Sequence, residues 1–392
     1  MTMLEERPLD EPFAADPATA RRQAATSPET ADRPRSISSR TFDDRMSLGG
    51  SAVASLCLVW LLYTVVLPMS GKLGFVLLWF VAFVLLYAGV TAVSQPGPVV
   101  RDRIASAVIQ GGAAVVLLVL VFTVAYTFVR GFPAYRHLNF FTQDMSSAGP
   151  SDPLTQGGIK HAVVGSLIEL GIAVLIALPL GLTTAVFMTE IGGRFGRIVR
   201  TIVESMTALP DLVAGLFIYA FLLIALGQER NGFAAAVALS ITMLPIIARS
   251  ADVVLRIVPG GLREASLALG ASHWRTVWSV VLPTARPGLA TALILGMARG
   301  IGETAPVLIV SQPSAYFESN PFHNPMNSLP LFAYTGIRAP DTNSHTRGFG
   351  AACVLLATVI VLFVVIRILA RQRRARDARP RPWTRLARRA SS

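Results

Sequence analysis

Charged residues are scarce in this 392-residue chain, at 15% of the sequence, whereas hydrophobic residues make up 53%. That balance argues against a soluble globular domain and favours a protein embedded in lipid. Cysteine is scarcer still: Cys57 and Cys353 are the only two, which excludes a disulfide framework. The five histidines are scattered without the spacing of metal ligands, so we expect neither a metal site nor a cofactor.

A nucleotide-binding P-loop is also missing. Such a loop requires Gly-Lys followed by Ser or Thr, and the one Gly-Lys pair, Gly71-Lys72, is followed by Leu73. We therefore expect that this chain is not an enzyme and that any ATP hydrolysis it depends on occurs on another chain.

Long hydrophobic runs are what the sequence does have. Each is long enough to cross the hydrocarbon layer of about 30 Å as a helix. Because open sheet edges cannot face lipid, we predict an all-α, polytopic membrane protein. The eight expected spans are 51–67, 73–93, 104–129, 159–187, 208–227, 232–249, 284–311 and 348–368.

The positions of the basic residues predict the orientation. With the N-terminus in the cytoplasm, 27 of the 35 Lys and Arg residues fall on the inner side. Cytoplasmic loops retain positive charge, so we expect both termini inside, in a bacterial cytoplasmic (inner) membrane. The net charge of +12 then reflects topology and contact with anionic lipid, not binding to nucleic acid.

Composition divides the chain into four parts. Residues 1–47 are polar and lack apolar periodicity, which predicts a disordered cytoplasmic tail. We expect residues 48–100 to form an appended transmembrane hairpin, 101–370 to form the main membrane domain, and 371–392 to form a basic cytoplasmic tail. Arginines at every third position within 192–205 suggest a helix lying in the inner interface.

A polar segment near 256–283 separates two spans on the expected cytoplasmic side. We predict a short helix over 262–269, with Glu264 in its first turn and Gly270 at its end. A second helix, capped by Ser272, is expected to present one apolar face, with Pro283 opening the next span. The bland alternative is an ordinary connector whose Trp residues anchor it at the membrane surface.

The spacing in this segment resembles the coupling loop of ABC-importer permeases. Its matching positions are Glu264, Ala265, Ser266 and Gly270, followed by Val280-Val281-Leu282-Pro283. Pro245-Ile246-Ile247-Ala248-Arg249 and Ala298-Arg299-Gly300-Ile301-Gly302-Glu303-Thr304-Ala305-Pro306 are similar to one family, the PstA-type permeases of the bacterial phosphate ABC importer. Ser266 in place of a second Ala and the intramembrane Glu169 depart from the family pattern.

The resemblance implies a six-helix type I ABC-importer permease core, here preceded by the hairpin. It also implies transport of inorganic phosphate and four kinds of partner: a second, PstC-type permease subunit, a dimer of ATP-binding subunits, an extracytoplasmic phosphate-binding protein and the lipid bilayer. Glu264, Ala265, Ser266 and Gly270 would contact the ATP-binding subunits. Other readings are a permease for another oxyanion or small solute, a membrane scaffold or sensor of phosphate supply, and a secondary transporter.

Two charges fall inside one expected span. Arg299 lies near its middle, and Glu303 is one turn further on, close enough to pair with it. A guanidinium binds phosphate oxygens with forked donors, so we expect Arg299, Glu303 and the adjacent Thr304 to line the substrate path. Arg249 is a second cationic candidate. The structural alternative is an Arg–Glu pair that only joins two helices, with snorkelling accounting for Arg249.

Overall fold

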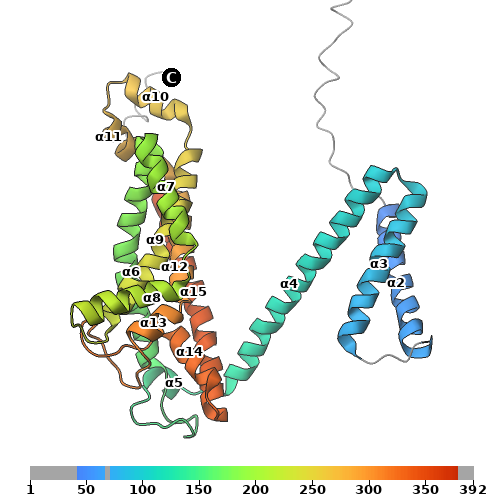
Figure 1. The fold of residues 1–392 in the computed structure, drawn as a ribbon, viewed down its shortest axis with the longest axis horizontal. Coiled ribbons are helices and arrows are strands. Elements are labelled where there is room, and N and C mark those ends of the chain that lie inside the picture. The colour runs from blue at the N-terminus through green and yellow to red at the C-terminus, as the bar shows by residue number, and fades with distance from the viewer. Residues whose placement is uncertain (1–41, 67–70, 378–392) are drawn as a thin grey trace, which may run out of the picture. The chain divides into compact units, whose positions relative to one another are not determined.

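The computed structural model describes residues 42–66 and 71–377, and every regular element in these ranges is helical. Most of the expected tail 1–47 and the end of the basic tail, 378–392, lie outside the described residues. In chain order, with η marking π-helical turns, the elements in Figure 1 are α2 (Phe42–Leu61), η2 (Leu62–Val66), α3 (Lys72–Ser94), α4 (Gly97–Tyr135), α5 (Asn139–Thr142), α6 (Lys160–Val186), η3 (Phe187–Ile191), α7 (Gly193–Thr207), α8 (Asp211–Ile218), η4 (Tyr219–Ala225), α9 (Gly232–Ile257), α10 (Gly260–Ala268), α11 (His273–Thr276), η5 (Val277–Val281), α12 (Leu282–Ile301), α13 (Ala305–Val310), α14 (Leu329–Arg338) and α15 (Thr342–Asp377).

The chain divides into two compact units within α4, between Leu118 and Val119. In the first unit α2 and α3 form the predicted hairpin. The Trp79 Nε1 atom donates to the Ala52 carbonyl at 3.3 Å and joins the two helices. Because α4 runs unbroken across residue 100, the predicted boundary there between an appended hairpin and the permease domain stays a prediction.

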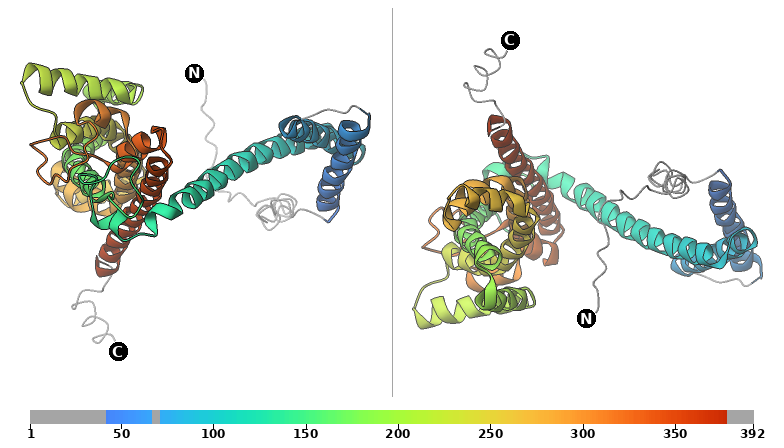
Figure 2. Two further views of the ribbon diagram at one scale, coloured as in Figure 1. Left: turned by 90° about the horizontal axis from the view of Figure 1, so that it is seen from below. Right: turned by 90° about the horizontal axis from the view of Figure 1, so that it is seen from above.

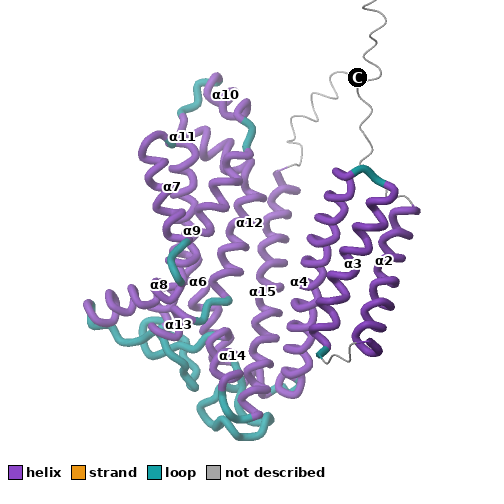
Figure 3. Tube along the Cα trace, turned by 45° about the vertical axis from the view of Figure 1, so that its right-hand side comes forward, coloured by secondary structure: helices purple, strands orange, loops and turns teal. Residues whose placement is uncertain are grey.

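In the second unit α6, α9, α12 and α15 run along one common direction (Figures 1 and 3). The short helices α10 and α11 lie at one end of this bundle, which we name the coupling end. Helices α5 and α14 and the loops beside them lie at the opposite end. Helix α8 projects sideways from the bundle (Figure 2).

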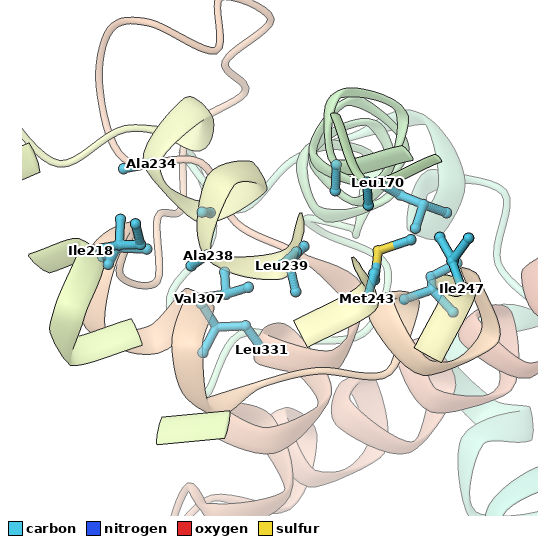
Figure 4. Close-up of a cluster of buried hydrophobic side chains, with 14 residues drawn as sticks. Leu170, Ile218, Ala234, Ala238, Leu239, Met243, Ile247, Val307 and Leu331 are labelled. Carbon is cyan, nitrogen blue, oxygen red and sulfur yellow. The ribbon is translucent and has the colours of Figure 1, made fainter. Parts of the chain in front are cut away.

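Small residues allow α6 and α9 to approach closely at the centre of the second unit. Ala173 and Ala177 of α6 and Ala235 and Ala238 of α9 have no exposed surface. Without a hydrophobic driving force between helices in lipid, such close packing is a main source of association. Larger side chains complete this buried cluster, among them Leu239, Met243 and Ile247 of α9 and Leu331 of α14 (Figure 4); the cluster fixes α9 as the central helix.

Seven helices among the described residues are long and apolar enough to cross a membrane, and they match seven of the eight predicted spans. The eighth predicted span, 208–227, corresponds to the helical segment Asp211–Ala225, which qualifies as a candidate span only together with α7. Helix α7 and the segment Asp211–Ala225 form a pair bent by 99°. Pro210 stands at this corner in an extended conformation and supplies no backbone donor, so the helix cannot continue through it.

Two further elements bear on the predictions. Helix α7 packs against α9 through Val203 and Ala248 and is the first arm of the bent pair, and its position in the inner interface stays a prediction. The span predicted at 284–311 is interrupted, since α12 ends at Ile301 and α13 begins at Ala305. Pro306 lies in the first turn of α13, where its missing N–H costs no helical hydrogen bond.

Candidate functional site

Arg299 and Glu303 lie where the helix is interrupted. Arg299 is in the last turn of α12, and Glu303 lies in the break before α13. The Arg299 Nε atom is 2.9 Å from the Glu303 Oε1 atom, which confirms the predicted pair. The side chain of Arg299 is 48% exposed and that of Glu303 only 9%, so the guanidinium is accessible while its partner is enclosed.

Asp211 completes the cluster. It is the first residue of α8, and its Oδ2 atom accepts a hydrogen bond from the Arg299 Nη2 atom. One guanidinium is thus shared by two carboxylates that are 88 and 4 residues away in sequence. We call Arg299, Glu303 and Asp211 the charged cluster.

A small cleft of about 70 Å³ adjoins the charged cluster. Its polar lining comes from Asp211, Arg299 and the hydroxyl-bearing Thr207 and Thr242, and the rest of the lining is apolar. The residues belong to α7, α8, α9 and α12 and to the corner between α7 and α8, so the cleft forms where four helices meet.

Glycines bring the helices of the cleft together. A Cβ atom added at Gly300 would be 2.4 Å from the Met243 sulfur, and one added at Gly215 would be 2.7 Å from the Pro306 Cα atom. The first contact joins α12 to α9, and the second joins α8 to α13. Gly215 therefore requires glycine, because the clashing atom is backbone, whereas a Cβ at Gly300 would require the Met243 side chain to move.

Of the other two predicted pathway residues, Thr304 adjoins the charged cluster and Arg249 lies apart from it. Thr304 directly follows Glu303 and occupies the N-cap position of α13 without a side-chain capping hydrogen bond. Arg249 is exposed on α9, one helical turn beyond Pro245 and Ile246 of the cleft and nearer the coupling end. Among the described residues no ion pair involves Arg249. The four predicted residues are thus not one site but a cluster and a separate cation.

The predicted coupling loop is present as α10 and α11. Gly270 adopts a φ of +81°, as predicted for a helix end, and the Ser272 hydroxyl caps α11 by accepting from the Arg275 N–H. Helix α10 begins at Gly260, two residues earlier than predicted, so Glu264 lies outside its first turn. The Ser266 and Thr276 hydroxyls, 2.9 Å apart, join the two helices.

Pro283 lies at the start of α12, as predicted, although helical structure is continuous from His273 to Ile301. The π-helical turn η5 precedes this proline and accommodates its missing donor. The turn also divides the predicted apolar face. Val277 and Val281 are buried, whereas Trp274 and Trp278 are 62% and 58% exposed.

The loop presents its remaining residues outward. Glu264, Ala265 and Gly270 are exposed, and Ser266 is half-buried. Leu269 is 89% exposed and, with the two tryptophans, gives the coupling end an apolar surface that no described residue covers. Isolated exposed apolar residues are ordinary, but several on one polar-rimmed projection indicate a contact surface.

Two buried carboxylates near the coupling end were missed by the sequence analysis. Glu190, at the end of η3, is 3.0 Å from the Arg263 Nη2 atom of α10, and its carbonyl oxygen is 3.1 Å from the His273 Nε2 atom of α11. Asp252 of α9 accepts hydrogen bonds from Arg200 of α7 and from Arg256. Their partners are mostly 52 to 83 residues away, so no local motif identifies them.

Glu169 is buried in α6 with 1% of its surface exposed. Within the described residues its Oε1 atom has no hydrogen-bond partner. It lies outside the lining of the cleft, and nothing in the structure explains this departure from the family pattern.

Comparison with known proteins connects this geometry to a family. Residues 177–375, which include the cleft and the coupling helices, match the model of the binding-protein-dependent transport system inner membrane component. The Mycobacterium tuberculosis (strain H37Rv) phosphate transport system permease protein PstA 1 is 36% identical over 279 residues, which cover 70% of this chain and 90% of the relative. PstA of Haemophilus influenzae is 31% identical over 61% of this chain and 83% of its own length.

A solved structure supports the fold. The bacterial alginate ABC transporter in complex with its alginate-bound periplasmic protein contains a chain that aligns with a TM-score of 0.50 and 15% identity, over 71% of this chain and 96% of that one. Fold, family model and sequence identity agree: the chain belongs to the PstA phosphate transport permeases, within the inner membrane components of binding-protein-dependent transport systems.

Proposed function

We propose that this chain is a transmembrane permease subunit of an ABC importer that moves inorganic phosphate inward. The observation that carries the proposal is the 36% identity to a phosphate transport permease along nine-tenths of that protein's length. The charged cluster agrees with it, because an accessible guanidinium beside a small polar cleft suits a tetrahedral oxyanion.

In this proposal Arg299, Glu303 and Thr304 contact phosphate in transit, together with Asp211. Two carboxylates on one guanidinium limit how tightly an anion is held, so the site passes its cargo on. Arg249 would receive phosphate next. It lies one turn nearer the coupling end on the same face of α9 as the cleft residues, and no acidic partner neutralises it among the described ion pairs.

The coupling helices would bind an ATPase carried on separate chains. Glu264, Ala265, Ser266 and Gly270 form the contact, with the exposed Leu269 and the tryptophans entering a groove of the partner. This chain would hydrolyse no ATP itself, since its sequence contains no P-loop.

The complete importer then needs partner subunits of three kinds. A PstC-type subunit forms the other half of the permease, a dimer of ATP-binding subunits drives it, and an extracytoplasmic phosphate-binding protein delivers phosphate to the end that carries α5 and α14. In this arrangement the coupling end faces the cytoplasm, as do both termini, and residues 101–370 form the permease domain behind an appended hairpin.

The test is phosphate uptake into proteoliposomes that contain the complete importer. We expect Arg299→Gln to lower the uptake rate by about tenfold or more, because a charged hydrogen bond contributes about 1.5–3 kcal/mol. That variant also leaves two carboxylates without their cation, so instability could mimic a loss of transport.

A triple variant separates the two causes. Arg299→Gln combined with Asp211→Asn and Glu303→Gln removes the unpaired charges, so we expect the thermal stability of the complex to recover while phosphate uptake stays low. Normal phosphate uptake by the triple variant would show that the charged cluster is architectural and that phosphate passes elsewhere.

A further inference from the structure

A few polar contacts connect the coupling helices to the helices that line the cleft. Arg263 of α10 makes three of them. It donates to the Glu190 Oε1 atom at 3.0 Å, to the Leu255 carbonyl at 2.9 Å and to the Val258 carbonyl at 3.0 Å. Helix α10 is therefore fastened both to the end of α6, through η3, and to the end of α9.

A second set of contacts begins one residue away. The hydroxyl of Thr189, the neighbour of Glu190 in η3, shares its proton between the Ala185 carbonyl at 2.7 Å and the Asp252 Oδ1 atom at 3.0 Å. Arg200 of α7 donates to the same oxygen at 3.1 Å, and Arg256 donates to it at 3.2 Å. Asp252 thus joins η3, α7 and α9, and its side chain is only 11% exposed.

Helix α7 connects this point to the cleft. Arg200 and Thr207 are seven residues apart on α7, a helical distance of about 10 Å. The corner after Thr207 is held by backbone hydrogen bonds from Ala208 to Ser205 and from Leu209 to Met206. Asp211 follows immediately and binds Arg299. A displacement at Arg200 is therefore carried to Asp211 by a helix and a hydrogen-bonded corner rather than by a loose loop.

Two glycines form the junction between η3 and α7. Gly192 and Gly193 both adopt positive φ angles, +58° and +65°, with open space where a Cβ would be. Glycine takes such conformations without steric cost, so the chain can change direction here. Across this turn η3 and α7 are joined by the packing of Met188 against Val203 and by the polar contacts of Asp252.

We infer that Asp252 is the positioning residue through which the coupling helices move α7 and, with it, Asp211 relative to Arg299. Motion of α10 reaches η3 through Arg263 and Glu190, passes to α7 through Thr189, Asp252 and Arg200, and alters the Asp211–Arg299 contact. This inference rests on the proposed function, because the motion is taken to drive transport. The contacts that would carry the motion do not depend on which solute is transported.

The first experiment measures the phosphate imported per ATP hydrolysed by the complete importer in proteoliposomes. We expect Asp252→Asn and Arg200→Gln each to lower this ratio by about fivefold or more, the lower end of typical coupling free energies, while ATP hydrolysis continues. Arg197→Gln is the matched control and should keep the wild-type ratio, since Arg197 is an exposed arginine of the same helix whose side chain has no hydrogen bond or ion pair among the described residues. Asp252→Glu should restore most of the coupling.

A second measurement does not depend on the solute. Spin labels at Phe217 of α8 and Leu295 of α12, both exposed, report the distance between the helices that carry Asp211 and Arg299. We expect ATP binding to change this distance in the otherwise wild-type importer, in which Cys57 and Cys353 are replaced, and to change it little in Asp252→Asn or Arg200→Gln.

The outcomes separate the inference from the function. A wild-type importer that shows the ATP-dependent distance change but carries no phosphate would overturn the proposed function and leave the inference standing. Variants that keep both the wild-type ratio and the wild-type distance change would overturn the inference. So would a parallel fall in complex stability, ATP hydrolysis and uptake with an unchanged ratio, because that result assigns Asp252 a structural role only.

Discussion

A single side chain, Arg347, organises the loop at the end of the bundle opposite the coupling helices. It is 2% exposed at the start of α15. Its guanidinium donates to the carbonyl oxygens of five residues of one loop, which are Gly149, Pro150, Asp152, Pro153 and Gln156. A buried guanidinium is costly unless its donors are satisfied, and here backbone dipoles replace the hydration shell.

We expect Arg347→Met to destabilise the permease by about 3 kcal/mol, because several buried carbonyls lose their donors at once. Limited proteolysis of the purified protein should then cut within 143–158, a region that we expect to resist cleavage in the wild type. Arg338→Met is the control, since Arg338 is exposed and bonds only to the Tyr334 hydroxyl. Equal protease resistance of the two variants would contradict this role.

The sequence predicts the partners of some buried charged residues but not of others. Arg299 and Glu303 are found because they are four residues apart, within one turn, where a helix places partners side by side. The five acceptors of Arg347 are 191 to 198 residues away, and the cation that binds Glu190 is 73 residues away. Contacts at such separations depend on the tertiary fold, and composition and spacing carry no signal for them.

At the scale of elements, helix α6 depends on glycine at one position and not at another. A Cβ added at Gly165 would be 2.0 Å from the Asn327 carbonyl oxygen, which is backbone and cannot rotate away. At Gly171, one and a half turns along the same helix, nothing lies within 4 Å. The first glycine therefore permits close packing against the loop before α14, and the second has no packing role within this chain.

We expect Gly165→Ala to lower the free energy of unfolding by about 1–3 kcal/mol, the usual range for overpacking. Gly171→Ala should be neutral or slightly stabilising, since alanine has the higher helix propensity. The midpoint of thermal unfolding of the purified complex measures both. A Gly165→Ala protein as stable as Gly171→Ala would mean that the loop yields without cost.

The hydropathy of the sequence predicts which segments enter the membrane, but it does not predict where the helices bend or break. It identifies seven spans correctly because each helix is long and apolar. It gives no sign that Pro210, at the start of the span predicted at 208–227, turns the chain by 99° from α7, and it misses the break at Gly302 to Thr304. Both features lie beside the charged cluster, and irregular backbone is tolerated at membrane depth where it is enclosed by protein.

At the scale of the whole molecule, the second unit works as a bundle with two different ends. Helices α10 and α11 project from one end and present exposed apolar side chains, while the other end is built of loops held by polar contacts (Figure 1). The cleft lies between them, where α7, α8, α9 and α12 meet. Such an arrangement suits a transporter that contacts its ATPase partner at one end and receives its solute at the other.

The turn at Gly270 tests this arrangement. Its φ of +81° is strained for residues with a Cβ, most of all for β-branched ones, although no neighbouring atom lies within 4 Å. We expect Gly270→Val to lower ATP-driven phosphate uptake up to about tenfold, since forcing the left-handed conformation costs about 1–2 kcal/mol or reshapes the turn. Uptake into proteoliposomes, together with membrane abundance, measures the effect.

Gly270→Asn is the matched variant, because asparagine tolerates the left-handed region better than other residues with a side chain. It should transport nearly as the wild type does. If valine and asparagine behave alike, the conformation of the turn is not what the ATPase partner requires.

The π-helical turn η5 has a consequence for how related chains align with this one. Such a turn holds one more residue than the α-helical turn it replaces, so the helix on either side keeps its own register. Removing one residue within Val277–Val281 returns the turn to α geometry, whereas removing one from α12 rotates everything beyond it by about 100° and misdirects Arg299. A length difference of one residue between this chain and a relative is therefore best placed as a gap at 277–281, at the base of the coupling helices.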